Sequence, residues 1–139
     1  MKVRVTKAEI VEALRSEPLA AGQWIDARRM DGPMSQSCNV CAVGAVLRRL
    51  VLSPTTSASD LCSAAWKVAG DQHGPVDQLI ADGEYLSALS ALFEDAPPRS
   101  RRKEAIALVE TRFPESLDID TNGFAPKPGA SLLTSGASS

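Results

Sequence analysis

Alternating and helical patterns of apolar residues divide the chain into short elements. Residues 2–5 read Lys-Val-Arg-Val, and this alternation of polar and apolar positions predicts a short strand. Thr6 and Glu9 then form the ends of a capping box, Thr-Lys-Ala-Glu, in which each side chain can satisfy a free amide at a helix start. We therefore expect a helix from this box to about Arg15, ended by Pro18.

The middle of the chain carries the clearest helical periodicity. Apolar residues recur at helical spacing over residues 40–52, which predicts a helix with Arg48 and Arg49 outside its apolar stripe. Gly44 in this helix either marks a close approach of another backbone or is simply tolerated. We expect Trp66 on the inner face of the next helix, over residues 58–69. The further helical patterns cover residues 58–69, 75–82, 84–94 and 100–112, with Pro75 as a first helical residue and a break or kink at Gly83.

A second alternating segment and a change in composition mark the end of the domain. Residues 117–120 read Leu-Asp-Ile-Asp and can pair as an edge strand with Val3 and Val5. We expect one globular domain over residues 1–124 and a flexible tail over 125–139, where Pro, Gly, Ala and Ser dominate. The fold class is mainly α: a compact domain of about five helices with two to three short β-strands at its periphery.

Composition agrees with packed helices and excludes some functions. Apolar residues make up 44% of the chain but aromatic residues only 4%, so Leu, Val, Ile and Ala must build the core. The formal net charge of −2 gives no general attraction to nucleic acid or to an anionic membrane. No apolar run approaches the roughly 18 residues of a membrane-spanning helix. Three cysteines argue against a closed disulfide framework, so we expect a cytoplasmic protein.

Clustered basic residues are the leading candidate for a binding surface. Four of them crowd the start of the last helix, where positive charge opposes the helix dipole. We predict a surface for an acidic partner or a phosphate backbone, with a solvated face as the alternative, although no aromatic residues interleave to stack bases. Because exposed charges add little to stability, replacing Arg101, Arg102 and Lys103 with Glu is expected to weaken binding and leave stability nearly unchanged. The full predicted set is Arg28, Arg29, Arg48, Arg49, Arg99, Arg101, Arg102 and Lys103.

Cysteine and histidine positions allow an alternative metal site. Cys38 and Cys41 form a C-x2-C pair, and Cys62 with His73 could complete a Cys3His zinc set, although the spacing of this second pair is too long for the usual motif. Packing as small apolar residues is the simpler role for the cysteines. No phosphate loop, nucleophile elbow or His-Glu-x-x-His motif is found, so we assign no catalytic residue and expect no cofactor.

Two short stretches resemble a known class of proteins. Residues 22–25, Gly-Gln-Trp-Ile, and residues 41–48, Cys-Ala-Val-Gly-Ala-Val-Leu-Arg, resemble a pattern of small orphan proteins of phages and mobile elements, which include anti-CRISPR inhibitors. The resemblance implies a non-enzymatic inhibitor that binds a host protein or ribonucleoprotein complex, such as a Cas effector. Trp24 either covers the core or anchors a partner. A zinc-stabilised interaction domain and a small enzyme of unknown type are the alternative functions.

Overall fold

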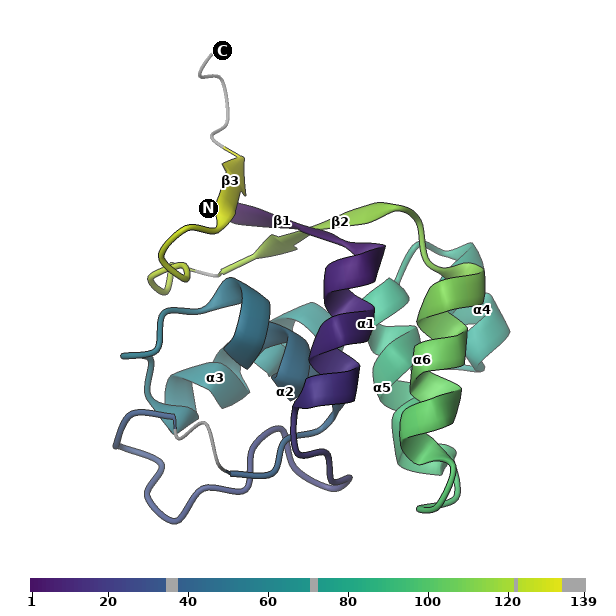
Figure 1. Cartoon of the computed structure of the whole chain (residues 1–139), viewed down its shortest axis with the longest axis horizontal. Helices are drawn as coiled ribbons and strands as arrows, with labels where there is room; N and C mark the ends of the chain where they lie inside the picture. The colour runs from purple at the N-terminus through teal and green to yellow at the C-terminus, as the bar shows by residue number, and fades with distance from the viewer. Residues whose placement is uncertain (35–37, 71–72, 122, 134–139) are drawn as a thin grey trace.

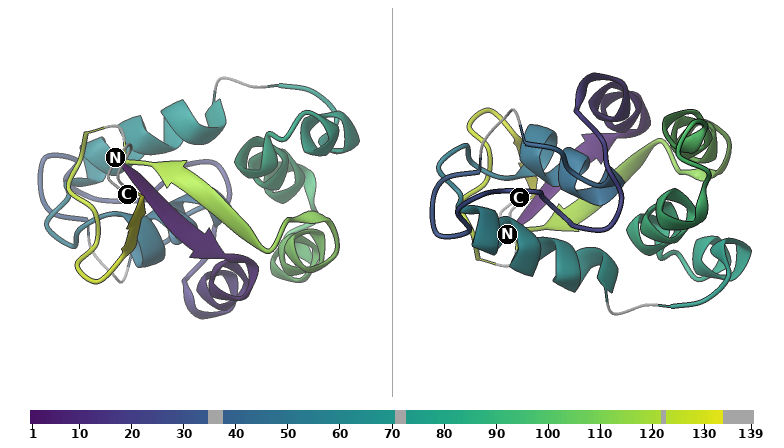
Figure 2. Two further views of the ribbon diagram at one scale, coloured as in Figure 1. Left: turned by 90° about the horizontal axis from the view of Figure 1, so that it is seen from above. Right: turned by 90° about the horizontal axis from the view of Figure 1, so that it is seen from below.

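The computed structural model describes residues 1–34, 38–70, 73–121 and 123–133. Within these residues the chain forms six α-helices, two π-helical segments and one three-stranded antiparallel sheet. Figure 1 shows the sheet lying across one side of the helices, and the view from above in Figure 2 shows its strands crossing over them. The fold is mainly α with a small β component, as the sequence pattern predicted.

The sheet has the order β2-β1-β3, so the first strand of the chain lies in its middle. β1 (Lys2–Thr6) pairs antiparallel with β2 (Ser116–Asp120), which places Val3 opposite Ile119. Both side chains are buried in the core, and the predicted pairing of the two alternating segments is confirmed. On its other edge β1 pairs with β3 (Ser131–Leu133), a strand that the sequence pattern did not predict.

The helix α1 (Lys7–Ser16) begins at the predicted capping box. The Thr6 hydroxyl accepts the amide hydrogen of Glu9 at 3.1 Å, and the Glu9 carboxylate accepts that of Thr6 at 2.8 Å. α1 packs against α6 (Arg101–Arg112), which in turn packs against α5 (Tyr85–Asp95). These three helices form one half of the helical layer beneath the sheet (Figure 1).

Two helices predicted as continuous are each divided into an α-helical and a π-helical part. The parts are α2 (Ala42–Val46) with η1 (Leu47–Val51), and α3 (Ala58–Ala65) with η2 (Trp66–Gly70). In η1 the Leu52 amide donates to the Leu47 carbonyl at 2.9 Å, a spacing of five residues. This wider turn changes the direction of the side chains that follow. Arg48 is buried and Trp66 is 53% exposed, the reverse of what the sequence pattern predicted for both residues.

The predicted break at Gly83 is confirmed. α4 (Val76–Ala81) ends two residues before this glycine, and α5 begins two residues after it. Gly83 has a φ of +80°, in the left-handed region that glycine adopts without steric cost. Pro75 is the N-cap residue of α4, one position earlier than predicted.

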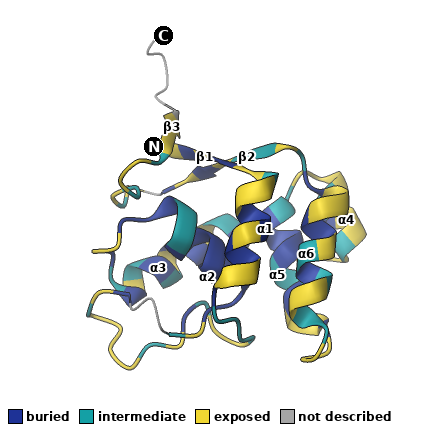
Figure 3. Cartoon of the chain, viewed as in Figure 1, coloured by how far each residue is buried: buried dark blue, intermediate teal, exposed yellow. Residues whose placement is uncertain are grey.

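Leucine, valine, isoleucine and alanine supply most of the core, together with Phe93 and Phe113. Figure 3 shows the buried residues on the inner faces of α1, α2, α5 and α6, while the outer faces of α1 and α6 are exposed. No helix among the described residues is long and apolar enough to cross a membrane. The described part of the chain thus buries its apolar residues in one continuous cluster.

The prediction of a flexible tail from residue 125 needs correction. The Lys127 amide donates to the carbonyl of Val51 at 2.8 Å, and Pro126 forms an isolated β-bridge with Leu52. The chain then enters the sheet as β3. Residues up to 133 are therefore part of the folded structure, because their backbone groups pair with η1 and β1. The last six residues of the predicted tail, 134–139, lie outside the described residues.

Candidate functional site

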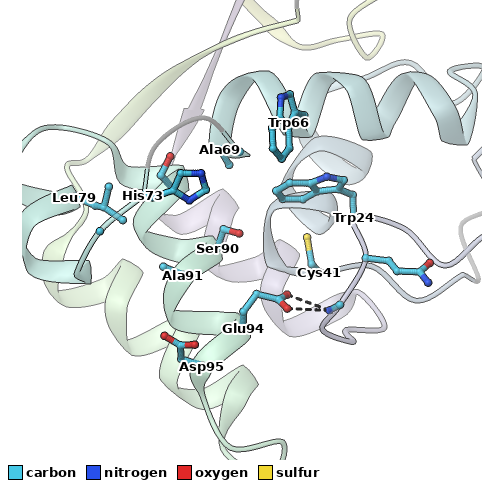
Figure 4. Close-up of a pocket in the computed structure, with 15 residues that line it drawn as sticks. Trp24, Cys41, Trp66, Ala69, His73, Leu79, Ser90, Ala91, Glu94 and Asp95 are labelled. Atoms are coloured by element: carbon cyan, nitrogen blue, oxygen red, sulfur yellow. Dashed lines mark hydrogen bonds between the residues drawn. The ribbon is translucent and has the colours of Figure 1, made fainter.

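A pocket of about 460 Å³ opens between α5, η2 and the irregular segment before α2 (Figure 4). This volume lies in the usual range for small-molecule sites. Both tryptophans of the chain and its single histidine line the pocket. Its most informative lining residues are Trp24, Cys41, Trp66, His73, Ser87 and Glu94.

Backbone contacts fix Trp24 at one side of the pocket. The Asp26 amide donates to the Asn39 carbonyl at 2.8 Å, so the segment that carries Trp24 runs beside the residues before α2. A Cβ atom added to Gly44 would lie 2.1 Å from the Trp24 carbonyl oxygen, much closer than atoms can approach. Gly44 therefore permits the close approach of another backbone, which was one of its two predicted roles.

Trp66 is the first residue of η2 and stands beside the same pocket. A Cβ atom added to Gly70 would lie 2.4 Å from Cε3 of the Trp66 ring, so the indole occupies the space that a larger residue would fill. Figure 4 shows both indole rings on one side of the pocket. The absence of a side chain at Gly70 thus determines where the Trp66 ring can lie.

The helix α5 supplies the opposite wall. A stripe of small and polar residues at helical spacing faces the pocket, while the apolar residues Leu89 and Phe93 point into the core. The stripe consists of Ser87, Ser90, Ala91 and Glu94. Ser87 is only 3% exposed, and its hydroxyl has no hydrogen-bond partner among the described residues. A buried hydroxyl of this kind can still donate to or accept from a ligand.

The charged residues of the pocket are acidic. Both carboxylate oxygens of Glu94 accept the amide hydrogen of Gly22, at 3.0 and 3.2 Å (dashed lines in Figure 4). This contact holds the carboxylate in place and leaves most of its acceptor capacity free. Asp95 is the next residue on α5. Among the described residues that line the pocket there is no lysine or arginine, so its lining carries acidic side chains without a basic counterpart from these two residue types.

Cys41 lines the pocket as a neutral thiol. Its sulfur accepts the amide hydrogen of Gly44 at 3.3 Å and caps the N-terminus of α2. Burial raises the pKa of the Cys41 thiol to about 12, with a smaller contribution in the same direction from the nearby charge of Glu94. The thiolate form, which is the nucleophile and metal ligand, is therefore scarce at neutral pH.

The arrangement does not contain a formed catalytic pair among the described residues. His73 is exposed, and Figure 4 shows it facing the pocket near Ser90. No hydrogen bond among these residues joins His73 to a serine or a carboxylate. Nucleophilic catalysis needs such a contact to activate the nucleophile and orient the base. The pocket is consequently better suited to binding than to this kind of chemistry.

The alternative zinc set is not assembled in the structure. Cys38 and Cys62 are half-buried, and burial raises the pKa of the Cys62 thiol. Cys41 is used as a helix cap, and His73 faces the pocket. In the described part of the chain, no three His, Cys, Asp or Glu side chains are grouped closely enough to hold a metal ion. Zinc uptake itself stays a prediction.

Two of the predicted binding arginines contact Glu17 inside the protein. Arg48 has a fully buried side chain, and its Nε lies 2.7 Å from a carboxylate oxygen of Glu17. The Arg49 guanidinium lies 3.7 Å from the other oxygen. The assignment of Arg48 to an exposed binding surface is therefore corrected, because its charge is neutralised within the fold.

Two further arginines of the predicted set cap helix ends. Arg102 donates from Nη1 to the carbonyls of Leu14 and Glu17, at 2.7 and 2.9 Å, where α1 ends. Arg101 donates from Nε to the Phe93 carbonyl at 3.0 Å, and its guanidinium lies 5.2 Å from the centre of the Phe93 ring. Both side chains thus satisfy carbonyls that a helix C-terminus leaves unpaired.

The other four predicted residues are exposed and lie on two separate parts of the molecule. Arg28 and Arg29 belong to the irregular segment, and Arg99 and Lys103 lie at the start of α6. These two regions are at opposite ends of the helical layer in Figures 1 and 2. A single surface made of all eight basic residues is not formed, and partner binding by either exposed pair stays a prediction.

Sequence reasoning missed the pocket because its residues come from distant segments. Trp66 was expected to face the core. In α5 the apolar residues are the dominant pattern, and the stripe of Ser87, Ser90, Ala91 and Glu94 lies beside them. The sequence offered two signals of the pocket. Trp66 lies four residues before Gly70, and serines recur at helical spacing in α5.

Comparison with known proteins adds no further guide to the site. The candidate site therefore depends on the geometry of this chain alone. The resemblance to small phage and mobile-element proteins stays a prediction. None of the protein-family models, curated proteins or solved structures compared with the chain matches it.

Proposed function

We propose that the chain is a binding protein that holds a group of a protein partner in the pocket between Trp24, Trp66 and α5. The observation that carries this proposal is the half-exposed Trp66 ring beside the pocket. Tryptophan is enriched among the residues that dominate binding energy at protein interfaces, because it buries a large area with little loss of side-chain freedom.

The partner that we propose is a host protein or ribonucleoprotein complex, such as a Cas effector, whose activity the chain inhibits. This part of the proposal comes from the resemblance to phage and mobile-element proteins. Contact through protein rather than through nucleic acid is favoured by the negative charge of the pocket, since a phosphate backbone requires positive charge.

Affinity capture with matched variants tests this function. The tagged wild-type protein, Trp66→Ala and Met30→Ala are each incubated with bacterial lysate, with and without nuclease, and retained proteins are identified by mass spectrometry. Met30 is 40% exposed and lies outside the pocket, so Met30→Ala removes a comparable apolar side chain elsewhere. We expect one partner that the wild type and Met30→Ala retain and Trp66→Ala loses.

Equal capture by all three proteins would show that the pocket does not bind the partner. Loss of capture after nuclease treatment would show that nucleic acid bridges the two proteins or forms the contact. Circular dichroism of each variant checks that the fold is retained, which is expected because neither replaced side chain belongs to the buried core.

A further inference from the structure

The charges around the pocket indicate the kind of group that it binds. Glu94 and Asp95 contribute two carboxylates, and none of the described lining residues is a lysine or an arginine. The Gly22 amide fixes the Glu94 carboxylate without supplying a full counter-charge. A cationic group would therefore gain an ion pair here that the protein itself does not provide.

The aromatic residues of the pocket favour a planar cation as the bound group. Figure 4 shows the indole rings of Trp24 and Trp66 close together on one side of the pocket, while α5 with Glu94 forms the opposite wall. Cations are attracted to indole faces, and the planar guanidinium group also stacks on them. An ammonium group would gain the electrostatic attraction but not the stacking.

The buried hydroxyl of Ser87 supplies a third, independent contact. It lines the pocket, is almost fully buried, and has no hydrogen-bond partner among the described residues. Leaving a buried polar group without a partner is unfavourable, so a donor that enters the pocket relieves this cost. A guanidinium carries five N–H donors, so it can donate to a carboxylate and still have N–H groups left for a neutral acceptor.

We propose that the pocket binds the guanidinium group of an arginine side chain of the protein partner, an inference that rests on the proposed function. Glu94 pairs with the guanidinium, the indole of Trp66 or Trp24 stacks on its face, and Ser87 accepts one of its N–H groups. The side chain of the partner thus enters between η2 and α5.

Tryptophan fluorescence measures this binding directly, because both tryptophans of the chain line the pocket. The probe is the peptide acetyl-Gly-Arg-Gly-amide, compared with the same peptide that contains citrulline, a neutral analogue of arginine. We expect a saturable change in emission with the arginine peptide and a dissociation constant at least about tenfold higher with the citrulline peptide. The absence of a saturable change at millimolar arginine peptide, or equal affinity for both peptides, would overturn the proposal.

Charge-removing variants locate the ion pair. Glu94→Gln keeps an acceptor for the Gly22 amide but removes the charge, and should weaken binding of the arginine peptide about tenfold. Glu115→Gln, at a residue whose side chain is 93% exposed outside the pocket, should leave the affinity unchanged. Equal effects of the two variants would contradict a specific pair with Glu94.

Further measurements test whether the guanidinium belongs to a protein or to a small molecule, and whether the arginine inference and the proposed function fail independently. Propylguanidine, a small guanidine without a second charge, should bind more weakly than the peptide, and tighter binding of propylguanidine would assign the pocket to a small molecule. If Trp66→Ala loses the partner while both peptides bind equally, the proposed function stands and the arginine inference is wrong. If Trp66→Ala retains the partner, the proposed function is wrong even where the arginine peptide binds.

Discussion

At the N-terminus of α2, the Cys41 thiol accepts the amide hydrogen of Gly44 while its side chain is almost completely buried. A serine, threonine, aspartate or asparagine is usual at this position. The thiol combines a weak acceptor with an apolar character that suits its position between the pocket and the core. Its role is structural, because the reactive thiolate is suppressed by the same burial.

This burial predicts a specific pH dependence. The pKa is 9.0 in the unfolded chain and about 12 in the folded chain, so the contribution of Cys41 is constant below pH 9. At higher pH the unfolded thiol loses its proton first, and the free energy of unfolding falls by roughly 1.4 kcal/mol per pH unit. Urea unfolding of the wild type and Cys41→Ser from about pH 8 upwards measures this. Serine can cap the helix but does not titrate, so equal slopes for the two proteins would contradict the buried thiol.

Single residues also show where sequence reasoning was sufficient. Gly44 sits in a regular apolar pattern, so its high cost in a helix already suggested a close contact. Trp66 gave no such signal, because the position of its ring depends on the space above Gly70. A residue can be placed from sequence when its constraint is local, and not when it depends on packing.

At the scale of elements, arginines connect the ends of the helices. Arg102 extends from α6 to the carbonyls at the C-terminus of α1, and Arg101 reaches back to the C-terminus of α5. Arg48 and Arg49 attach η1 to Glu17, which follows α1. Four of the eight basic residues that the sequence suggested as a partner surface are thus used to join neighbouring helices.

These contacts change the expected effect of mutation at the start of α6. Arg102→Ala removes three hydrogen bonds to backbone carbonyls and should lower the free energy of unfolding by about 1–2 kcal/mol. Lys103→Ala, at the adjacent exposed position, should change it by less than about 0.5 kcal/mol. Thermal or urea unfolding of both variants checks the difference. The sequence analysis expected charge changes at the start of α6 to leave stability nearly unchanged. If the two variants are equally stable, that expectation holds for Arg102 as well.

The elements that could be predicted from the sequence are those formed by local interactions. The capping box at Thr6 and the break at Gly83 are local, and both were predicted correctly. The pairing of β1 with β2 was predicted because both segments alternate with the same period. η1, η2 and β3 were not predicted, because each depends on contacts with distant segments. The pocket was missed for the same reason, since each of its walls has an ordinary local pattern.

At the scale of the whole molecule, the sheet joins segments from both ends of the described chain. β3 and the residues before it contact β1, η1 and Leu52, and they cover a part of the core that the helices leave open. Ala130 packs against the core cluster. The folded unit therefore needs residues beyond the predicted boundary at 124.

Truncation tests this contribution. A chain that ends at Phe124 loses β3 and the hydrogen bond from Lys127 to Val51, so its midpoint of thermal unfolding should fall by about 5 °C or more. A chain that ends at Leu133 keeps both and should unfold close to the wild-type temperature. Differential scanning calorimetry of the two chains gives the comparison, and equal midpoints would show that β3 adds no stability.

The central position of β1 also affects how the protein is made. During synthesis β1 leaves the ribosome well before the segment that pairs with it, because Asp118 follows its partner Arg4 by 114 residues. Until then the nascent chain carries a strand with both edges open and with Val3 and Val5 uncovered. Such edges invite pairing with other chains, so β1 is a segment where we expect the nascent chain to be prone to aggregation and to capture by chaperones.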